Sequence, residues 1–334
     1  MRAAVVSGLG SWLPPRVVTN DELTARLDTT DEWIRSRIGV VTRHVVEPGT
    51  ATSDLSVEAA RRALRSAGVP GAGGVLLATT TPDRPCPATA PEIASRLGLV
   101  DVPAFDIAAV CTGFVYGLGV GAGLITAGIA DSLLVIGGDA YSTILNPEDR
   151  TTSVIFGDGA GAVVLRAGSP DEPGALGPFD LGSDGARSDL ITVRAGGSRQ
   201  RSSRDVVPPP GDEFFQMEGR EVFANAVARM AAASRTALKR QGWAESDVDR
   251  VIAHQANVRI LDAVSAELGV PRDRFVSNIS DVGNTSAASI PLALAHGVRT
   301  GELRAGQKVL LTAFGGGLTW GATTLVWPEL SLAE

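Results

Sequence analysis

Cys111 lies in the segment Asp106-Ile-Ala-Ala-Val-Cys-Thr-Gly-Phe114, where a short apolar stretch gives way to a long apolar run rich in glycine. A cysteine at such a junction is expected at the N-terminus of a buried helix. The unpaired backbone N–H groups and the helix dipole at that position favour the thiolate over the thiol. Cys111 is therefore a candidate nucleophile, although a small buried cysteine that only packs would show the same pattern.

Two further polar residues stand where a predicted strand meets a predicted helix. His254 lies in Ala253-His-Gln-Ala-Asn-Val-Arg-Ile260, at the strand end where α/β proteins place functional groups. Asn284 lies in Gly283-Asn-Thr-Ser-Ala-Ala-Ser-Ile290. Taken singly, His254 is also compatible with a structural histidine, and Asn284 with an N-cap of the helix that follows it.

Other kinds of site find no support in the sequence. Cysteines, histidines and acidic residues do not cluster with metal-ligand spacing. The Gly-x-Ser-x-Gly elbow of serine hydrolases is absent, and the glycines do not complete a dinucleotide-binding fingerprint. We therefore expect no metal and no nicotinamide cofactor.

The composition indicates a globular protein. The 334 residues are 44% hydrophobic and 20% charged, and the net charge of −7 argues against a nucleic-acid binder. Two cysteines, Cys86 and Cys111, do not suggest a disulfide framework, so we expect a cytoplasmic protein. The uncharged segment 113–130 is rich in glycine and is predicted as a buried helix, not as a membrane span.

Strand-like and helix-like segments alternate along the chain, which predicts an α/β fold. Val251 follows the apolar segment at Val75 by 176 positions, and Val309 follows Leu133 by the same number. This constant spacing predicts an internal duplication, with halves 1–170 and 171–334. Two such halves would pack about a pseudo-twofold axis and bring Cys111 close to His254 and Asn284. The Ser- and Arg-rich segment 194–211 is predicted to be an exposed loop.

Six segments together resemble the β-ketoacyl-acyl carrier protein synthase III family, and they span essentially the whole chain. They are Asp31-Glu-Trp-Ile34, the segment around Cys111, Ile155-Phe-Gly-Asp-Gly-Ala-Gly-Ala162, the segments around His254 and Asn284, and Phe314-Gly-Gly-Gly-Leu-Thr-Trp-Gly321. The resemblance implies a thiolase-like fold of two duplicated α/β halves in a five-layered αβαβα sandwich, assembled as a homodimer.

The resemblance also implies the chemistry. Cys111 would attack an acyl-CoA and become an acyl-thioester, with the N–H groups of Cys111 and Gly316 as the oxyanion hole. A malonyl thioester, delivered on an acyl carrier protein, would then lose CO₂. His254 and Asn284 would donate hydrogen bonds to the enolate that forms, and its attack on the acyl-Cys111 would give a β-ketoacyl product that primes fatty acid or polyketide synthesis.

Binding residues follow from the same resemblance. It implies CoA contacts from Trp33, Arg37, Arg150, Phe223, Asn257 and Arg259, and an acyl pocket that includes Cys86 and Phe314. Acyl-CoA would be a substrate, and no cofactor or metal is implied. Without the resemblance, Trp33 is also compatible with a surface aromatic residue that packs locally, and Cys86 with a loop cysteine remote from substrate.

The sequence departs from the family pattern at two places. Ala224, Ala266 and Glu267 stand where the family carries the cations that attract an acidic carrier protein, although Arg220, Arg229 or Arg235 could replace them. Cys86 stands where the family often has a bulky residue that reaches the partner's acyl pocket, so a larger starter could fit.

Two other functions are compatible with a reactive cysteine. One is an acyltransferase that passes the acyl group from Cys111 to an alcohol or amine without condensation. The other is a non-catalytic partner subunit of a synthase complex. Because His254 and Asn284 are both present with Cys111, condensation is the function that we expect.

Overall fold

The computed structural model describes residues 2–203 and 207–333. Five strands from the first half of the chain form one sheet, in the order β1-β7-β6-β4-β5. β4 runs parallel to β5 and β6, whereas β7 runs antiparallel to β6 and β1. The strands are β1 (Ala3–Trp12), β4 (Val75–Ala78), β5 (Ala104–Ile107), β6 (Ser132–Asp139) and β7 (Gly159–Gly168).

A four-stranded sheet in the order β11-β12-β13-β8 repeats this arrangement. β11 runs parallel to β12, and the next two pairings are antiparallel, as for β4, β6, β7 and β1. These strands are β8 (Asp180–Ser183), β11 (Arg250–Ala253), β12 (Lys308–Gly315) and β13 (Thr319–Val326). The duplication predicted from the residue spacing is therefore visible as two sheets with one pattern. The division at residue 170 stays a prediction; the first sheet ends at Gly168 and the second begins at Asp180.

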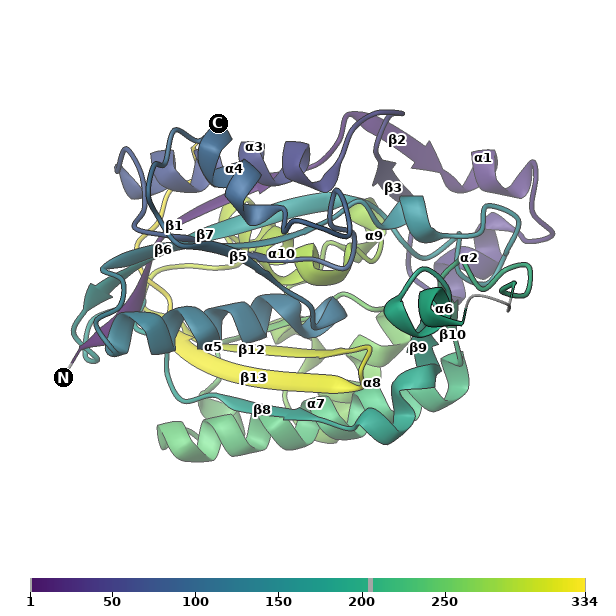
Figure 1. Ribbon diagram of the computed structural model, residues 1–334. Coiled ribbons are helices and arrows are strands. Elements are labelled where there is room, and N and C mark those ends of the chain that lie inside the picture. Colours follow the sequence, from purple (N-terminus) through teal and green to yellow (C-terminus); the bar gives the residue numbers. More distant parts are fainter. Residues whose placement is uncertain (1, 204–206, 334) are drawn as a thin grey trace.

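Helices complete five layers (Figure 1). α3 (Thr52–Ala67) and α4 (Ala90–Arg96) cover the outer face of the first sheet, and α7 (Gly219–Gln241) and α8 (Val258–Leu268) cover that of the second. α5 (Gly113–Thr126) and α10 (Ser289–Thr300) lie between the two sheets, where the largest hydrophobic cluster is. This is the predicted αβαβα order.

The glycines of α5 let this helix lie close to the first sheet. A Cβ atom added at Gly117 would be 3.0 Å from a methyl carbon of Val135, and one at Gly121 would be 2.9 Å from Leu165. Larger side chains would push the helix away and change the position of its N-terminus. The predicted buried helix over 113–130 is confirmed, although it ends at Thr126. Within residues 2–203 and 207–333, we find no helix with the length and hydropathy needed to cross a membrane.

Smaller elements surround one end of the sandwich, at the right of Figure 1. They are β2 (Arg16–Thr19), β3 (Thr42–Val45), β9 (Ile191–Thr192), β10 (Gln216–Met217), α1 (Asn20–Thr24), α2 (Asp31–Arg37), α6 (Ser198–Ser202) and α9 (Ile279–Val282), with 3₁₀ turns η1 (Val110–Thr112), η2 (Tyr141–Ile144), η3 (Gly185–Leu190) and η6 (Ser286–Ala288). Two further turns, η4 (Glu245–Asp247) and η5 (Arg272–Arg274), lie near the start of β12. The described part of segment 194–211 is largely exposed, as predicted, but it includes the short helix α6. Residues 204–206 of this segment lie outside the described residues.

Candidate active site

A single cavity of about 610 Å³ brings together Cys111, His254 and Asn284. Cys111 belongs to η1, which follows β5. His254 directly follows β11, and Asn284 lies between α9 and η6. Each of the three thus stands at the end of an element that the sandwich core holds. The proximity that the duplication predicted is confirmed.

Cys111 is a buried thiol, with 8% of its surface exposed. Burial raises the pKa of Cys111 to about 12, because the thiolate would lose its hydration in this setting. The residue does stand at the start of α5, as expected. The expectation of a thiolate in the resting protein is wrong, however, because desolvation outweighs the favourable helix terminus. A reaction that used Cys111 as a nucleophile would therefore have to remove the thiol proton.

The Cys111 sulfur has a polar neighbour that the sequence analysis did not identify. Its Sγ lies 3.7 Å from the Ser286 hydroxyl, to which the thiol donates a hydrogen bond. Ser286 lies within the Gly-Asn-Thr-Ser segment, two residues after Asn284. Its place in that segment could have marked it as a candidate site residue. Only the packing of η6 against η1, however, brings its hydroxyl into contact with the Cys111 sulfur.

His254 is 3% exposed and uncharged at neutral pH. Burial lowers the pKa of His254 to about 3, since no anionic group compensates the cost of a buried imidazolium. Its Nδ1 lies 2.7 Å from the hydroxyl of Ser289, the first residue of α10. When this hydroxyl donates to Nδ1, the second ring nitrogen, Nε2, carries the proton and can donate into the cavity. Ser289 was a further residue that the sequence analysis did not identify.

The side chain of Asn284 is oriented by its own backbone segment. Its Oδ1 accepts a hydrogen bond of 2.9 Å from the N–H of Ser286. Its backbone N–H donates to the Ile155 carbonyl at 2.9 Å. Because the carbonyl oxygen of the side chain is occupied, its NH₂ group is the part available to the cavity. His254 and Asn284 can therefore present two N–H donors to one ligand oxygen.

The glycine turn after β12 packs directly against η1. A Cβ atom added at Gly315 would lie 2.9 Å from the Cys111 nitrogen, and one at Gly316 would lie 3.1 Å from Val110. Gly315 lines the cavity, whereas Gly316 lines an adjacent depression of about 440 Å³. A side chain at Gly315 would displace the Cys111 backbone. The turn therefore needs glycine to approach the cysteine.

Four of the six residues implied for CoA binding line the cavity: Arg37, Phe223, Asn257 and Arg259. The Arg259 guanidinium lies 5.9 Å from the centre of the Phe223 ring. Asn257 caps α8, since its Oδ1 accepts a hydrogen bond from the Ile260 N–H at 2.9 Å. Its predicted CoA contact must therefore use the amide nitrogen.

Trp33 and Arg150 do not line the cavity. Trp33 is 44% exposed on α2, four residues before Arg37 and hence on the same face of that helix. Arg150 is exposed and donates a hydrogen bond of 2.7 Å to the Asp28 carbonyl. An adenine ring clamped between Trp33 and Arg150 would thus lie outside the cavity, towards solvent.

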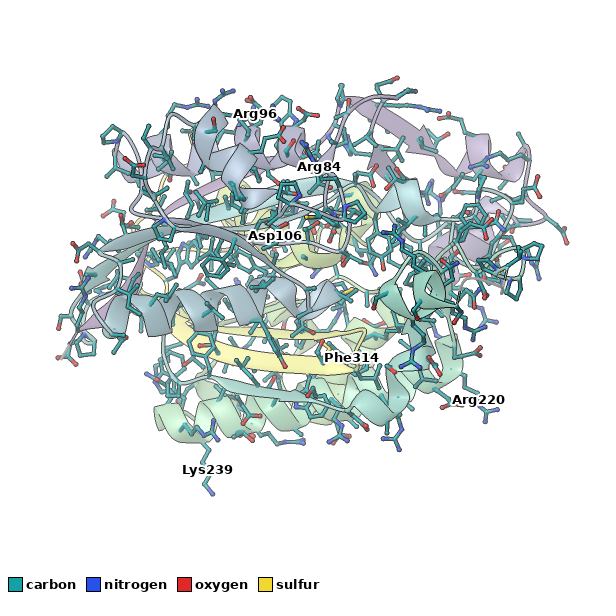
Figure 2. The ribbon with its side chains drawn as sticks, viewed as in Figure 1. Arg84, Arg96, Asp106, Arg220, Lys239 and Phe314 are labelled. Atoms are coloured by element: carbon teal, nitrogen blue, oxygen red, sulfur yellow. The ribbon has the colours of Figure 1, made fainter. Side chains whose placement is uncertain are left out.

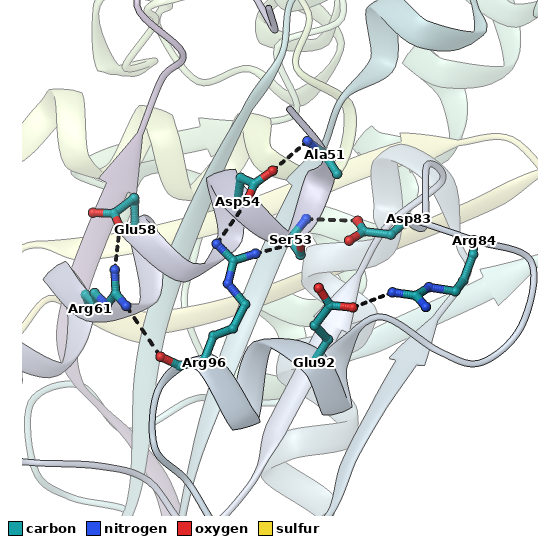
Figure 3. A network of polar contacts seen from close by, with 9 residues as sticks. All are labelled: Ala51, Ser53, Asp54, Glu58, Arg61, Asp83, Arg84, Glu92 and Arg96. Carbon is teal, nitrogen blue, oxygen red and sulfur yellow. Dashed lines mark hydrogen bonds and ion pairs between the residues drawn. The ribbon is translucent and has the colours of Figure 1, made fainter. Parts of the chain in front are cut away.

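The two residues predicted for the acyl pocket lie apart. Phe314, near the end of β12, lines the cavity and is buried (Figure 2). Cys86 is exposed. The loop that carries Cys86 is tied to α3 and α4 (Figure 3). Asp83 accepts a hydrogen bond from the Ser53 N–H at 3.0 Å, and Arg84 pairs with Glu92 at 2.5 Å. Within one chain, Cys86 therefore does not reach the cavity, and its pocket role stays a prediction that requires a second copy.

A cluster of three aromatic residues forms one wall of the cavity, and none of the three was predicted as a site residue from the sequence. The rings of Tyr141 and Phe156 stack at 4.4 Å, and Phe215 packs edge-on against both. All three line the cavity together with Ile155, Ile191 and Met217. These residues come from distant segments, so nothing in their sequence spacing indicates that they form one surface.

Of the arginines considered as replacements for the missing cations, two are already engaged. The Arg229 guanidinium stacks on Trp320 at 4.3 Å, and Arg235 pairs with Glu267 at 3.4 Å. Arg220 instead lines the cavity at the start of α7 and extends towards the molecular surface (Figure 2). Arg220 is thus the replacement best placed to meet an acidic partner.

The described residues contain no group of three or more His, Cys, Asp or Glu side chains that could hold a metal ion. Apart from its cysteine, histidine and asparagine, the cavity offers mainly apolar walls and arginines. The layered fold and this buried thiol with two N–H donors define a thiolase-fold enzyme of the acyltransferase class.

Comparisons with known proteins agree with the fold. Residues 105–185 match the family model for 3-oxoacyl-[acyl-carrier-protein (ACP)] synthase III, and residues 238–327 match the model for its C-terminal part. The chain is 59% identical to β-ketoacyl-[acyl-carrier-protein] synthase III 3 of Streptomyces coelicolor, and the match covers 98% of both chains. It is 54% identical to the β-ketoacyl-[acyl-carrier-protein] synthase III of Pseudomonas aeruginosa, with the same coverage.

Solved structures extend the likeness to three dimensions. The crystal structure of 3-oxoacyl-(acyl carrier protein) synthase III from Pseudomonas aeruginosa PAO1 superposes with a TM-score of 0.93 at 52% identity, over 98% of this chain and 99% of that one. The priming β-ketosynthase of the R1128 polyketide pathway has a TM-score of 0.90 at 34% identity, over 99% of this chain and 98% of that one. The chain belongs to the β-ketoacyl-acyl carrier protein synthase III family.

Proposed function

We propose that the protein condenses an acyl starter from acyl-CoA with a malonyl group carried by an acyl carrier protein. The observation that carries the proposal is the placement of Cys111, His254 and Asn284 around one cavity. In the first half-reaction, the Cys111 sulfur attacks the thioester carbonyl of acyl-CoA. The thiol proton passes to Nε2 of His254 in the neutral tautomer whose Nδ1–H donates to the Ser289 hydroxyl, and the N–H groups of Cys111 and Gly316 stabilise the oxyanion. CoA then leaves with the proton from Nε2, and His254 changes to the tautomer with its proton on Nε2 before the second half-reaction.

The second half-reaction requires two hydrogen-bond donors and no base. The malonyl carboxylate leaves as CO₂, and the electrons of the broken C–C bond form an enolate. His254 Nε2–H and the Asn284 amide donate to its oxygen. The enolate carbon attacks the acyl-Cys111 carbonyl, the C–S bond breaks, and the sulfur takes up one proton from solvent as the β-ketoacyl product leaves, which replaces the proton that left with CoA. A neutral histidine suits this step, because its Nε2–H can donate to the enolate oxygen. Asn284 suits it as the second donor, because a carboxylate in its place would repel the enolate.

The substrates fit the surroundings of the cavity. Arg37, Arg220 and Arg259 line it and can pair with the phosphates of CoA or of a carrier-protein arm. Phe314 and the aromatic cluster would enclose the acyl chain. No resident cofactor or metal is required by this chemistry, and we propose that the protein uses none and acts in the cytoplasm.

We also propose that the protein works as a homodimer. β5 is the last strand of the first sheet, so within the described chain one of its edges has no strand partner. The exposed loop with Cys86 precedes the same sheet edge, where a second copy would receive it. Sedimentation velocity should give twice the mass of one chain; a monomer would remove Cys86 from the acyl pocket.

The decisive experiment follows both half-reactions in one preparation. The protein is incubated with a panel of acyl-CoAs, and the mass of the Cys111 peptide is measured before and after addition of malonyl-acyl carrier protein. We expect an acyl-Cys111 adduct and then CO₂ release with loss of the adduct. Asn284→Ala should still form the adduct but release little CO₂.

The other outcomes distinguish the alternatives. An adduct that forms without CO₂ release and transfers to an alcohol or amine would establish an acyltransferase. No adduct with any acyl-CoA would indicate a non-catalytic partner subunit. Preference for acetyl-CoA alone would contradict an enlarged pocket at Cys86.

A further inference from the structure

Ser286 occupies an unusual position beside Cys111. It is completely buried, and its φ angle of +50° places it in the left-handed region, which a residue with a Cβ rarely adopts. Such a conformation persists only where surrounding contacts hold it. Two contacts are present: the Ser286 N–H donates to Asn284 Oδ1, and the next N–H, that of Ala287, donates to Asp139 Oδ2 at 3.1 Å.

Asp139 is a completely buried carboxylate at the end of β6. Among the described residues it forms no ion pair with Lys, Arg or His, and hydrogen bonds alone stabilise it. The four donors to Oδ1 are the N–H groups of Thr80 (2.7 Å) and Thr81 (3.2 Å) and the hydroxyls of Thr79 (3.1 Å) and Thr81 (3.2 Å). A buried carboxylate without a cation is costly, so its retention calls for a role.

The Cys111 thiol and the Asp139 carboxylate both form hydrogen bonds with η6. The Cys111 thiol donates to the Ser286 hydroxyl, which leaves the hydroxyl proton free to donate onwards. Burial raises the pKa of Asp139, and hydrogen bonds from Thr80, Ala287 and the Ser286 side chain oppose this rise. Through the Ser286 hydroxyl and the Ala287 N–H, the segment of η6 thus connects Cys111 with Asp139.

We propose that Asp139 and Ser286 are positioning residues for the nucleophile, in which the Asp139 carboxylate anchors η6 so that the Ser286 hydroxyl orients the Cys111 sulfur. In the resting protein the hydroxyl accepts from the thiol. When the thiol proton leaves, the same hydroxyl can rotate and donate to the sulfur. The inference rests on the proposed role of Cys111 as the nucleophile, but the contacts themselves belong to the free protein.

The titratable groups around the sulfur come from three elements. They are Asp139 at the end of β6, Tyr141 in η2, and His254 after β11. The Asp139 carboxylate raises the pKa of the Cys111 thiol, whereas the hydrogen bond with the Ser286 hydroxyl lowers it. Asp139 and Ser286 therefore shift the pKa of the Cys111 thiol in opposite directions. Looser packing alone would not produce such a pair of effects.

Alkylation of Cys111 by iodoacetamide tests this prediction without any acyl substrate. Rates are measured between pH 7 and 10 in a Cys86→Ser background, with the Cys111 peptide followed by mass spectrometry. Ser286→Ala should slow alkylation roughly ten-fold at each pH, because the thiolate loses a donor. Ser286→Gly, which removes the hydroxyl but also the strain of the positive φ, should slow it equally. Asp139→Asn keeps a side-chain oxygen that can accept from the Ala287 N–H but removes the carboxylate that raises the pKa of Cys111, so it should accelerate alkylation.

The matched control is Ser234→Ala in α7. Ser234 is as buried as Ser286, but its hydroxyl has no hydrogen-bond partner among the described residues, so alkylation should be unchanged. A wild-type rate in Ser286→Ala, or a change of the same sign in Ser286→Ala and Asp139→Asn, overturns the proposal. Where Asp139→Asn does not fold, the two Ser286 variants decide it. Because free thiol reactivity is measured, failure of the proposed condensation would leave this result intact.

Discussion

The chemistry of the site depends on how burial changes two side chains. Burial raises the pKa of Cys111 to about 12 and lowers the pKa of His254 to about 3, so both are neutral at pH 7. A neutral pair avoids a permanent ion pair inside the cavity, and each group can act as donor or acceptor as the reaction requires. The hydroxyls of Ser286 and Ser289 contact them, and a hydroxyl can reverse its hydrogen bond by rotation.

The thiol pKa predicts a characteristic pH dependence. The rate of Cys111 alkylation follows the thiolate fraction, which rises about ten-fold per pH unit well below the pKa. We expect the rate to increase steadily from pH 7 to pH 10 without levelling near pH 9. Iodoacetamide kinetics on the wild-type protein, read at the Cys111 peptide, give this curve. A plateau below pH 8 would instead show that a helix-terminus thiolate exists in the resting protein.

Ser289→Ala should separate the two half-reactions. Without its hydroxyl, Nδ1 of His254 has no donor, so the tautomer that presents Nε2–H to the enolate is no longer favoured. We expect CO₂ release from malonyl-acyl carrier protein to fall by about ten- to one hundred-fold, which corresponds to one lost buried hydrogen bond. Acylation of Cys111 should fall less, because it uses the Nε2 lone pair.

Ser289→Thr supplies the control for this prediction, since it retains the hydroxyl and should restore most CO₂ release. Stopped-flow acylation and ¹⁴CO₂ release, measured on the same preparations, give the two rates. Equal losses in both half-reactions would mean that Ser289 only supports the local fold.

At the scale of elements, the site is assembled where η1, η6 and the β12–β13 turn meet. The elements approach one another through glycine and alanine. A Cβ atom added at Gly137 of β6 would lie 2.3 Å from the Ala287 carbonyl oxygen in η6. Small residues at these contacts set the distance between the halves, and hence the distance between Cys111 and its partners.

A pair of glycine substitutions tests this packing. Gly137→Ala should destabilise the protein by about 1–3 kcal/mol, because the backbone of η6 must move to accept the methyl group. It should also slow condensation, since Asn284 and Ser286 move with η6. Urea unfolding monitored by circular dichroism, together with CO₂ release, measures both effects.

Gly123→Ala is the matched control within α5. No atom lies within 4 Å of a Cβ added at Gly123, and its backbone is helical. Alanine should therefore stabilise the protein by about 0.5–1 kcal/mol through helix propensity and leave condensation unchanged. A loss of stability at Gly123, or none at Gly137, would contradict the packing described above.

The aromatic wall is also a property of packed elements, because Tyr141, Phe156 and Phe215 come from η2 and two loops. Phe215→Leu removes the ring that packs edge-on against the other two while keeping an apolar side chain. We expect the preferred acyl-CoA to become longer by one or two carbons. Relative kcat/KM over a series of straight-chain acyl-CoAs tests this, and an unchanged optimum would place the acyl chain elsewhere.

At the scale of the whole molecule, burial of His254 lowers the free energy of unfolding at acidic pH. The unfolded chain binds a proton at His254 below about pH 6.5, whereas the folded protein excludes it until about pH 3. The unfolded state therefore gains protons first, and stability falls as the pH is lowered through this range. Between pH 7 and pH 5 we expect a loss of about 2 kcal/mol from this residue.

Chemical unfolding at the two pH values measures the loss, with His254→Gln as the comparison. The variant should show a pH dependence smaller by about the same 2 kcal/mol, because glutamine does not titrate. An identical pH dependence in the two proteins would mean that His254 takes up a proton in the folded state as readily as in the unfolded one.

Much of the molecule was predictable from its sequence, because the predicting signals are local or periodic. The spacing of 176 residues predicted two α/β halves, and the motifs around Cys111, His254 and Asn284 predicted the family. Glycine-rich apolar residues predicted the buried α5. These signals survive in a linear chain, since strand, turn and helix preferences depend on near neighbours.

Tertiary structure decided the rest, because burial and contact join residues far apart in the chain. The pKa of Cys111 depends on desolvation by the surrounding layers of the fold. The position at a helix N-terminus alone predicted a lowered pKa, whereas burial raises it. Asp139 and Ala287 are 148 residues apart and meet only through the approach of β6 and η6. Trp33, Arg150 and Cys86 lie outside the cavity for the same reason: a motif specifies a residue type, whereas the packing of one chain fixes what that residue can reach.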